Sequence, residues 1–375
     1  MIKGIFKSIA AVVLVPIAIG MIFSACNNKT DTIKIGFINP MTGELATYGE
    51  AVKRGVDVAL EEVNKDSLLG DKKLEILLQD SKGENKEAIN LLQKLINVDG
   101  VKYVIGDISS TVTLAMLPVT EQNNVFLFSP GAATPKLTGA GKLFARNWPS
   151  NNEEANSAAE YTFNQLNYKK AIIVYVNNDW GIGLMESFEK KFKDLGGIIA
   201  AKEIYNYENV DFKTLITKIK NINADCIYLA GNQVEMGNFM KQLRENKNLL
   251  PVISNTSFLE KSCLDIAGTA ANGVIVPTPA YDPKSTDAKI KSFYNAVKTK
   301  YNIEPWLADA NGYDAVMLIV EAINKVGNDP VKVAQYIRNL KNYDGAGGTL
   351  NFSDGDVSRE NIFKKIVNGK PEIIK

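Results

Sequence analysis

The sequence predicts an α/β protein made of two lobes, each with a doubly wound open sheet. From Thr32 onward, short apolar runs alternate with longer amphipathic segments, which is the pattern of parallel strands joined by helices. A similar series restarts at Asn151. The length of 375 residues agrees with two domains, at roughly 100–200 residues per domain.

The first series predicts a sheet with helices between its strands. The strands are expected at residues 32–40, 73–80, 103–107 and 125–129, and the helices at 49–65, 84–97 and from Ser110. In the first helix Val52, Val56, Ala59 and Val63 share one face, which predicts that this face packs on the sheet.

The second series is expected to repeat this arrangement. Helices are predicted at 151–167, 181–195, 211–222 and 235–245, and strands at 170–177, 198–205, 225–231, 251–255 and 273–277. Three more helices follow at 286–301, 308–326 and 330–340. In the tail, residues 348–352 and 361–367 flank the hairpin signal 353–356, and Asn368-Gly369 marks a further turn.

Charge and composition exclude several classes of function. The chain has 43 basic and 42 acidic residues, and phosphate binding needs a clear basic excess, so no nucleic-acid partner is expected. It has no histidine, which removes Ser-His-Asp and Cys-His catalysis and histidine metal sites. No carboxylates pair at a recognisable spacing, so we expect no enzyme, no catalytic residue, no cofactor and no metal.

The N-terminus has the features of an export signal. Lys3 and Lys7 precede the apolar stretch 9–23, which meets Ser24, Ala25 and Cys26. This resembles the lipobox of bacterial lipoproteins and implies removal of residues 1–25 and lipidation of Cys26. An uncleaved membrane anchor is the alternative. Either interpretation predicts an extracytoplasmic chain attached to the bacterial cell membrane, at its outer face or in the periplasm.

Two other cysteines remain, Cys226 and Cys263. Cys226 lies in an apolar run that predicts a buried strand, so two free thiols are expected, with a disulfide as the alternative.

Small and hydroxylated residues follow the predicted strands of the first lobe. Ser109 and Ser110 come after the third strand, and 129–134 after the fourth. Ligands of open α/β sheets bind beyond the carboxyl ends of strands, where backbone N–H groups are presented. These loops therefore predict a binding surface, although Ser110 as a simple helix cap is the alternative.

The chain is similar to the leucine/isoleucine/valine-binding family, the type I periplasmic binding proteins that feed branched-chain amino acid and amide ABC transporters. The motifs that carry the resemblance occur in the family's order along the mature chain: Thr42-Gly43, Tyr48-Gly49, Val104-Ile105-Gly106, Ser129-Pro130-Gly131-Ala132, Asn177-Asn178-Asp179-Trp180-Gly181, and Tyr313-Asp314-Ala315.

The resemblance implies two lobes joined by three crossovers. The lobes are expected to close over a small ligand. The expected N-terminal lobe is 26–150 plus 280–345, and the C-terminal lobe 151–279 plus 346–375. The implied protein is a monomer. Its partners are a small-molecule ligand, the membrane subunits of an ABC permease, and the membrane itself through the lipid anchor.

The resemblance also implies the ligand site. Ser110, beside Ser109, matches the serine that holds a ligand carboxylate in amino-acid binders. Ala132, Ala133 and Thr134 match the second wall of that pocket. The family more often has its threonine at the position of Ala133, so whether Ala133 or Thr134 donates is left open.

Two aromatic residues complete the expected site. Tyr48 matches an aromatic near the ligand side chain, and Trp180 matches a tyrosine that covers the ligand when the lobes close. A core position is the alternative for Trp180.

Two positions depart from the amino-acid binders. Asn232 stands where an aromatic is frequent, and Thr256 where the best-known members place a glutamate for the ligand ammonium. A buried ammonium needs a carboxylate or several acceptors. Glu235, Asp107 or Asp309 are candidates for that charge, with a solvated helix surface as the alternative for each.

The implied function is capture and delivery of a branched-chain or related amino acid. A binder of amides or short carboxylates, and a ligand-sensing receptor on the same fold, are the alternatives. Arg146, near a predicted crossover, is expected to form a structural salt bridge at the hinge, with carboxylate binding as its second interpretation.

Overall fold

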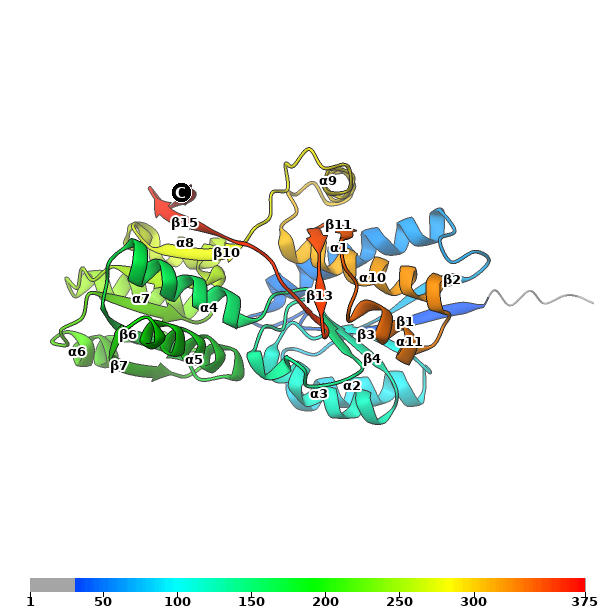
Figure 1. The fold of residues 1–375 in the computed structure, drawn as a ribbon, viewed down its shortest axis with the longest axis horizontal. Coiled ribbons are helices and arrows are strands. Elements are labelled where there is room, and N and C mark those ends of the chain that lie inside the picture. The colour runs from blue at the N-terminus through cyan, green and yellow to red at the C-terminus, as the bar shows by residue number, and fades with distance from the viewer. Residues whose placement is uncertain (1–30, 375) are drawn as a thin grey trace, which may run out of the picture.

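The computed structural model describes residues 31–374, which form two lobes lying side by side (Figure 1). Each lobe has its own sheet with helices packed against it, so the predicted fold class is confirmed. The predicted signal peptide and Cys26 lie outside the described residues. Within residues 31–374, no helix has the length and apolar character needed to cross a membrane.

The first lobe contains a five-stranded parallel sheet in the order β2-β1-β3-β4-β5. The strands are β1 (Thr32–Asn39), β2 (Lys73–Asp80), β3 (Tyr103–Gly106), β4 (Phe126–Ser129) and β5 (Phe144–Arg146). Every residue of β3 and β4 is buried, as expected where helices cover both faces of a parallel sheet. The sequence analysis missed β5, because three residues are too few to show a periodic pattern.

Helices from both ends of the chain cover this sheet. They are α1 (Ala46–Lys65), α2 (Asn85–Asn97), α3 (Ser110–Gln122), α9 (Ala288–Tyr301), α10 (Leu307–Val326) and α11 (Pro330–Ile337). Helices α1 and α10 cross in close contact. A Cβ atom on Gly312 would lie 2.1 Å from the Val52 carbonyl oxygen, and one on Gly55 would lie 1.8 Å from that of Asp309. Glycine at both positions is therefore what lets the two backbones approach.

The second lobe contains a seven-stranded sheet in the order β16-β15-β10-β9-β8-β6-β7. The strands are β6 (Lys170–Val176), β7 (Ile198–Tyr205), β8 (Cys226–Ala230), β9 (Val252–Ser254), β10 (Ile275–Pro279), β15 (Asn361–Val367) and β16 (Lys370–Ile374). Strands β6 to β10 are parallel, and the antiparallel pair β15–β16 extends the sheet beyond β10. The turn predicted at Asn368-Gly369 joins this pair.

Helices also cover the sheet of the second lobe. They are α4 (Asn151–Glu160), continued by the π-helical turn Tyr161–Gln165, then α5 (Asp179–Asp194), α6 (Lys213–Ile219), α7 (Gln233–Glu245) and α8 (Lys261–Ala267). Cys226 and Cys263 are buried free thiols in this lobe, as predicted.

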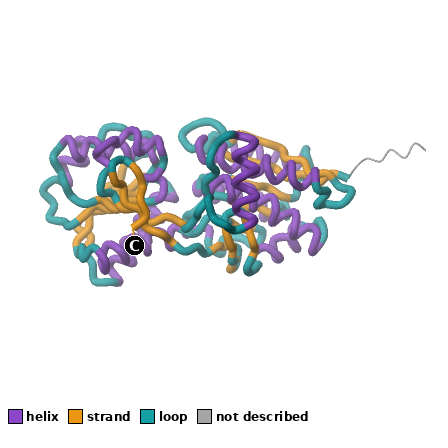
Figure 2. The backbone as a smooth tube through the Cα atoms, turned by 90° about the horizontal axis from the view of Figure 1, so that it is seen from above, coloured by secondary structure: helices purple, strands orange, loops and turns teal. Residues whose placement is uncertain are grey.

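Within residues 31–374 the chain passes between the lobes three times. The first passage lies between β5 and α4, and the second between β10 and α9. After α11, the short strands β11 (Tyr343–Gly345), β12 (Gly348–Leu350), β13 (Phe352–Ser353) and β14 (Asp356–Val357) form two hairpins whose apolar side chains belong to the core of the first lobe. Figure 1 shows β11 and β13 in that lobe and β15 beside β10 in the other, and Figure 2 shows the lobes from above as separate bodies.

The last passage therefore falls at residues 358–360, not at 345 as expected. Leu350, Phe352 and Val357 pack with the first lobe, and only β15 and β16 join the second. The turn predicted within residues 353–356 is present between β13 and β14. However, residues 361–367 pair with β10 and β16 and not across this turn.

Candidate ligand-binding cleft

A cavity of about 540 Å³ lies between the lobes, within the roughly 300–1,000 Å³ that small-molecule sites occupy. Its lining comes from loops at the carboxyl ends of strands in both sheets. From the first lobe come the loop before α1, the loop before α2, the start of α3 and the loop after β4; from the second come the starts of α4, α5 and α7 and the segment after β9.

The N-terminus of α3 faces this cavity. Ser109 is the N-cap, and its hydroxyl accepts a hydrogen bond from the Val112 N–H. Ser109, Ser110 and Thr111 all line the cavity. Among the described residues, the N–H groups of Ser110 and Thr111 have no hydrogen-bond partner, which is normal for a first helical turn. This end of the cavity can therefore hold an anion, as helix N-termini do.

The Ala132 to Thr134 segment lies behind Ser110. The Ser110 hydroxyl oxygen accepts hydrogen bonds of 3.1 Å from the N–H groups of both Ala133 and Thr134. Ala132, Ala133 and Thr134 are buried and do not line the cavity. They stand behind the cavity wall and not on it, because the N–H groups of Ala133 and Thr134 are taken by Ser110 and that of Ala132 by the Ser129 hydroxyl.

Arg146 holds this segment in place. Its buried guanidinium pairs with Asp356 at 2.7 Å and donates to the carbonyl oxygens of Ala132 and Thr134. The structural salt bridge predicted for Arg146 is confirmed. It ties the segment behind Ser110 to β14, just before the last passage between the lobes.

Tyr48 and Trp180 form aromatic walls of the cavity, one from each lobe. Tyr48 packs edge-on against Trp306 with ring centroids 4.8 Å apart, and its hydroxyl lies 3.3 Å from that of Ser257 in the second lobe. Trp180 is half-buried at the start of α5, where it both lines the cavity and contacts the core. Both positions suit a ligand lying between the lobes.

Thr256 lines the cavity but is itself bonded to a carboxylate. Its backbone N–H and its hydroxyl donate to the same oxygen of Glu154, Oε1, at 2.5 and 2.8 Å. Glu154 Oε2 has no hydrogen-bond partner within residues 31–374. Glu154 lines the cavity from the first turn of α4. Burial raises the pKa of its carboxyl to about 7, and the two bonds from Thr256 oppose part of that rise.

The three other candidate carboxylates are all buried, so the alternative of a solvated helix surface is wrong for each. The Asp107 carboxylate accepts hydrogen bonds from the Ser81 hydroxyl and the Ser109 N–H, and Asp309 forms an ion pair with Arg54 at 2.7 Å. Glu235 accepts from the Glu208 N–H. None of the three lines the cavity.

Sequence reasoning missed Glu154 and Glu44, the two buried or half-buried acids of the cavity wall. Glu154 has no local signal, because it is one of two consecutive glutamates at a helix start. Only the contact with Thr256, 102 residues away, distinguishes it. Asn232, by contrast, lines the cavity as expected. The described residues contain no cluster of acidic or cysteine side chains suited to a metal ion.

Comparison with known proteins agrees with this architecture. Residues 32–368 match the model of the family described as periplasmic binding protein. The chain is 28% identical to a leucine-, isoleucine-, valine-, threonine- and alanine-binding protein of Pseudomonas aeruginosa, over 89% of this chain and 90% of the relative. It is 30% identical to a Leu/Ile/Val-binding protein homologue of Brucella melitensis, over 88% and 91% of the two chains.

Solved structures give the same result. A leucine-binding protein of Thermotoga maritima superimposes with a TM-score of 0.85 at 27% identity, over 92% of this chain and 98% of that one. A branched-chain amino acid transporter substrate-binding protein of Streptococcus pneumoniae, solved with isoleucine, gives 0.83 at 26% identity, over 92% and 99%. The chain therefore belongs to the periplasmic binding protein family, as a type I member of the branch that contains the leucine/isoleucine/valine-binding proteins.

Proposed function

We propose that this protein is an extracytoplasmic, non-enzymatic receptor that captures an α-amino acid, of the branched-chain or a related kind, and delivers it to an ABC permease. The proposal includes a monomeric chain anchored through lipid on Cys26. Support comes from the export signal with its lipobox and from relatives described as amino-acid-binding proteins.

One observation carries the assignment to α-amino acids. The start of α3 can bind an anion at one part of the cavity lining, and the buried carboxyl of Glu154 belongs to the same lining. An α-amino acid presents a carboxylate and an ammonium together, and it needs a partner for each when both leave water. Ser110 and the first N–H groups of α3 would hold the carboxylate. Glu154 would hold the ammonium. In the best-known family members a glutamate at the position of Thr256 has that role.

Thr256 has a positioning role in this arrangement. It holds Glu154 Oε1 by two hydrogen bonds and leaves Oε2 for the ligand. An arriving ammonium would remove the proton that burial favours on Glu154 at neutral pH. Tyr48 and Trp180 would enclose the ligand from opposite lobes, so the closed state gains contacts that the open state lacks.

The test is a thermal-shift and calorimetric screen of the chain from Asn27 onward against amino acids, amides and short carboxylates. At least one α-amino acid should raise the melting temperature, and Glu154→Gln should weaken its binding by about 10- to 100-fold, the size of a lost charged hydrogen bond. Glu160→Gln is the matched control, because Glu160 is exposed on the same helix. Stabilisation only by amides or by carboxylates without an ammonium would reject the proposal in favour of the alternative ligand classes.

A further inference from the structure

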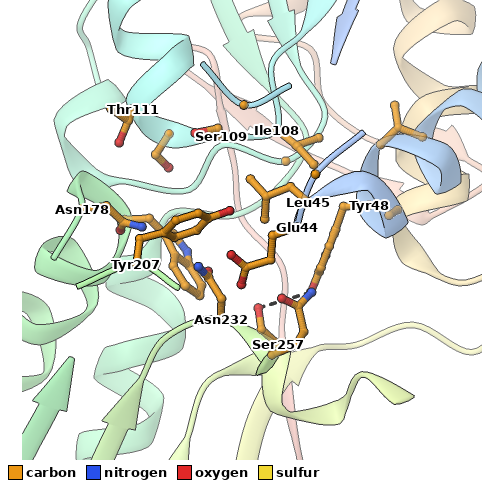
Figure 3. Close-up of a pocket in the computed structure, with 18 of the residues that line it drawn as sticks. Glu44, Leu45, Tyr48, Ile108, Ser109, Thr111, Asn178, Tyr207, Asn232 and Ser257 are labelled. Carbon is orange, nitrogen blue, oxygen red and sulfur yellow. Dashed lines mark hydrogen bonds between the residues drawn. The ribbon is translucent and has the colours of Figure 1, made fainter. Parts of the chain in front are cut away.

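Glu44 is an acidic side chain of the cavity that has no role in the proposed binding of the ligand's α-ammonium group. It lies in the loop between β1 and α1, is half-buried, and lines the cavity. Both of its carboxyl oxygens are enclosed without a hydrogen bond of normal geometry among the described residues, and the Tyr207 hydroxyl and the Glu235 carboxyl are their polar neighbours. Figure 3 shows its carboxyl reaching from the first lobe toward Tyr207 and Asn232 of the second.

The second lobe presents further unsatisfied polar atoms at this end. Asn232 lines the cavity and is only 5% exposed, yet its Nδ2 has no partner within residues 31–374 and its side chain does not cap α7. Glu235, one turn further along α7, is fully buried; its Oε1 accepts from the Glu208 N–H, while Oε2 has no described partner. Buried polar groups are normally paired, so this end of the cavity is incomplete without a ligand.

The local charge is negative. The carboxyls of Glu235 and Glu208 both act on Glu44, and the Tyr207 hydroxyl is the neutral group beside it. Of the described residues that line the cavity, Lys82 is the one basic side chain, against the acidic Glu44, Glu84, Glu154 and Glu208. Burial, with repulsion from Glu235 and Glu208, raises the pKa of Glu44 to about 8, although the Tyr207 hydroxyl opposes that rise.

These groups match a particular kind of ligand side chain. A leucine side chain here would leave the carboxyls and the Asn232 amide without partners, which is costly away from water. A side chain ending in an ammonium or guanidinium group supplies several donors and the missing positive charge. The Asn232 amide can turn its oxygen toward such a group by a half-rotation.

We propose that the ligand is an amino acid with a cationic side chain, whose terminal nitrogen contacts Glu44 and Asn232, with the buried carboxyl of Glu235 adding negative charge behind them. This inference rests on the proposed capture of an α-amino acid, and for the same cavity it puts a cationic side chain in place of the branched-chain one.

Calorimetry with a matched pair of ligands tests the proposal. Ornithine and norvaline share the α-amino acid group and a three-carbon side chain, but only ornithine carries the terminal ammonium. The chain from Asn27 onward contains both complete sheets and should bind ornithine at least about tenfold more tightly than norvaline, as one charged hydrogen bond requires. Glu44→Gln should remove most of this preference. Glu50→Gln, exposed on α1, should retain it.

A second measurement gives the number of protons released on binding. It repeats the calorimetry in buffers that differ in ionisation enthalpy. The raised pKa of Glu44 favours its protonated form at pH 7, and a bound ammonium would displace that proton to the buffer. Ornithine should therefore release more protons than norvaline does, and Glu44→Gln should abolish the difference.

The outcomes separate this inference from the proposed function. Equal or tighter binding of norvaline, or ornithine binding unchanged by Glu44→Gln, overturns the proposal of a cationic ligand side chain. The proposed function as an amino-acid receptor is not affected by that result. A preference for glutamine over ornithine also overturns the cationic side chain, because a neutral amide would then satisfy the site. If neither ornithine, norvaline nor any other α-amino acid binds, both proposals are rejected together.

Discussion

At the scale of single residues, Ser110 links the fold to the proposed ligand site. Its hydroxyl oxygen accepts from the N–H groups of Ala133 and Thr134 while the side chain lines the cavity. Ser110→Ala would leave both buried donors without a partner. We expect the free energy of unfolding to fall by about 1–3 kcal/mol, the usual cost of such groups, and amino-acid affinity to fall as the segment behind Ser110 moves. Urea unfolding and calorimetry measure the two effects.

Ser353→Ala is the matched control for this prediction, because Ser353 is exposed and its hydroxyl has no hydrogen bond among the described residues. Unchanged stability and affinity are expected for it. If Ser110→Ala lowers stability but leaves affinity unaltered, Ser110 serves the fold alone and the carboxylate is held elsewhere.

Sequence reasoning identified Ser109 and Ser110 from their place after a predicted strand, and Trp180 from the family resemblance. Ser109, Ser110 and Trp180 follow β3 or β6 directly, and the carboxyl ends of parallel strands meet at one edge of a sheet. Glu44 also follows a strand end, but no local pattern marks its carboxyl, and Glu154 follows β5, which the sequence analysis missed. Their environment arises from contacts between distant segments, with Thr256 for Glu154 and with the second lobe for Glu44.

At the scale of elements, the hinge is stabilised by one buried ion pair. Arg146 ends β5 and pairs with Asp356 of β14, so two of the three interlobe passages begin next to it. Asp356→Asn would leave the guanidinium of Arg146 buried without its counter-charge. We expect a loss of about 3–5 kcal/mol in unfolding free energy, which is typical when one partner of a buried pair is removed. Chemical denaturation measures it.

An exposed pair of the same chemistry provides the comparison. Lys190 and Asp194 form an i,i+4 pair on α5 whose side chains are 80% and 54% exposed. Asp194→Asn should change stability by less than about 1 kcal/mol. Equal effects of the two substitutions would mean that the Arg146 pair contributes no more than a surface contact.

The elements also show where sequence patterns stop being informative. Long helices and buried strands of the two series were predicted within a few residues of their observed ends. The last interlobe passage was misplaced because β11 to β14 are strands of two or three residues. Their assignment to the first lobe depends on Phe352 and Val357 packing into its core, and no periodic pattern of that length can reveal this packing.

At the scale of the whole molecule, buried carboxyls control how stability changes with pH. Burial raises the pKa of Asp314 to about 6, that of Asp107, Glu154 and Glu260 to about 7, and that of Glu44 to about 8. The chain has no histidine, so these groups dominate titration of its side chains between pH 5 and 8. The folded protein therefore binds more protons than the unfolded chain across this range.

The sign of the pH dependence follows from this difference in bound protons. Where the folded state holds more protons, stability falls as pH rises. The ordinary pKa values of these carboxyls are 3.8 for aspartate and 4.5 for glutamate. The stabilisation from these groups is thus complete below about pH 4 and is lost as pH rises through 6 to 8.

We expect the melting temperature of the ligand-free protein to fall steadily from pH 5 to pH 8, at about 2–4 °C for each kcal/mol lost. Glu154→Gln should make the curve less steep, whereas Glu160→Gln on the exposed face of α4 should not. A bound ammonium favours the charged form of Glu154, so a saturating amino acid should raise the melting temperature more at pH 8 than at pH 5. A ligand-free melting temperature that rises over this range would contradict the prediction, because it would mean that these carboxyls are already ionised in the folded protein.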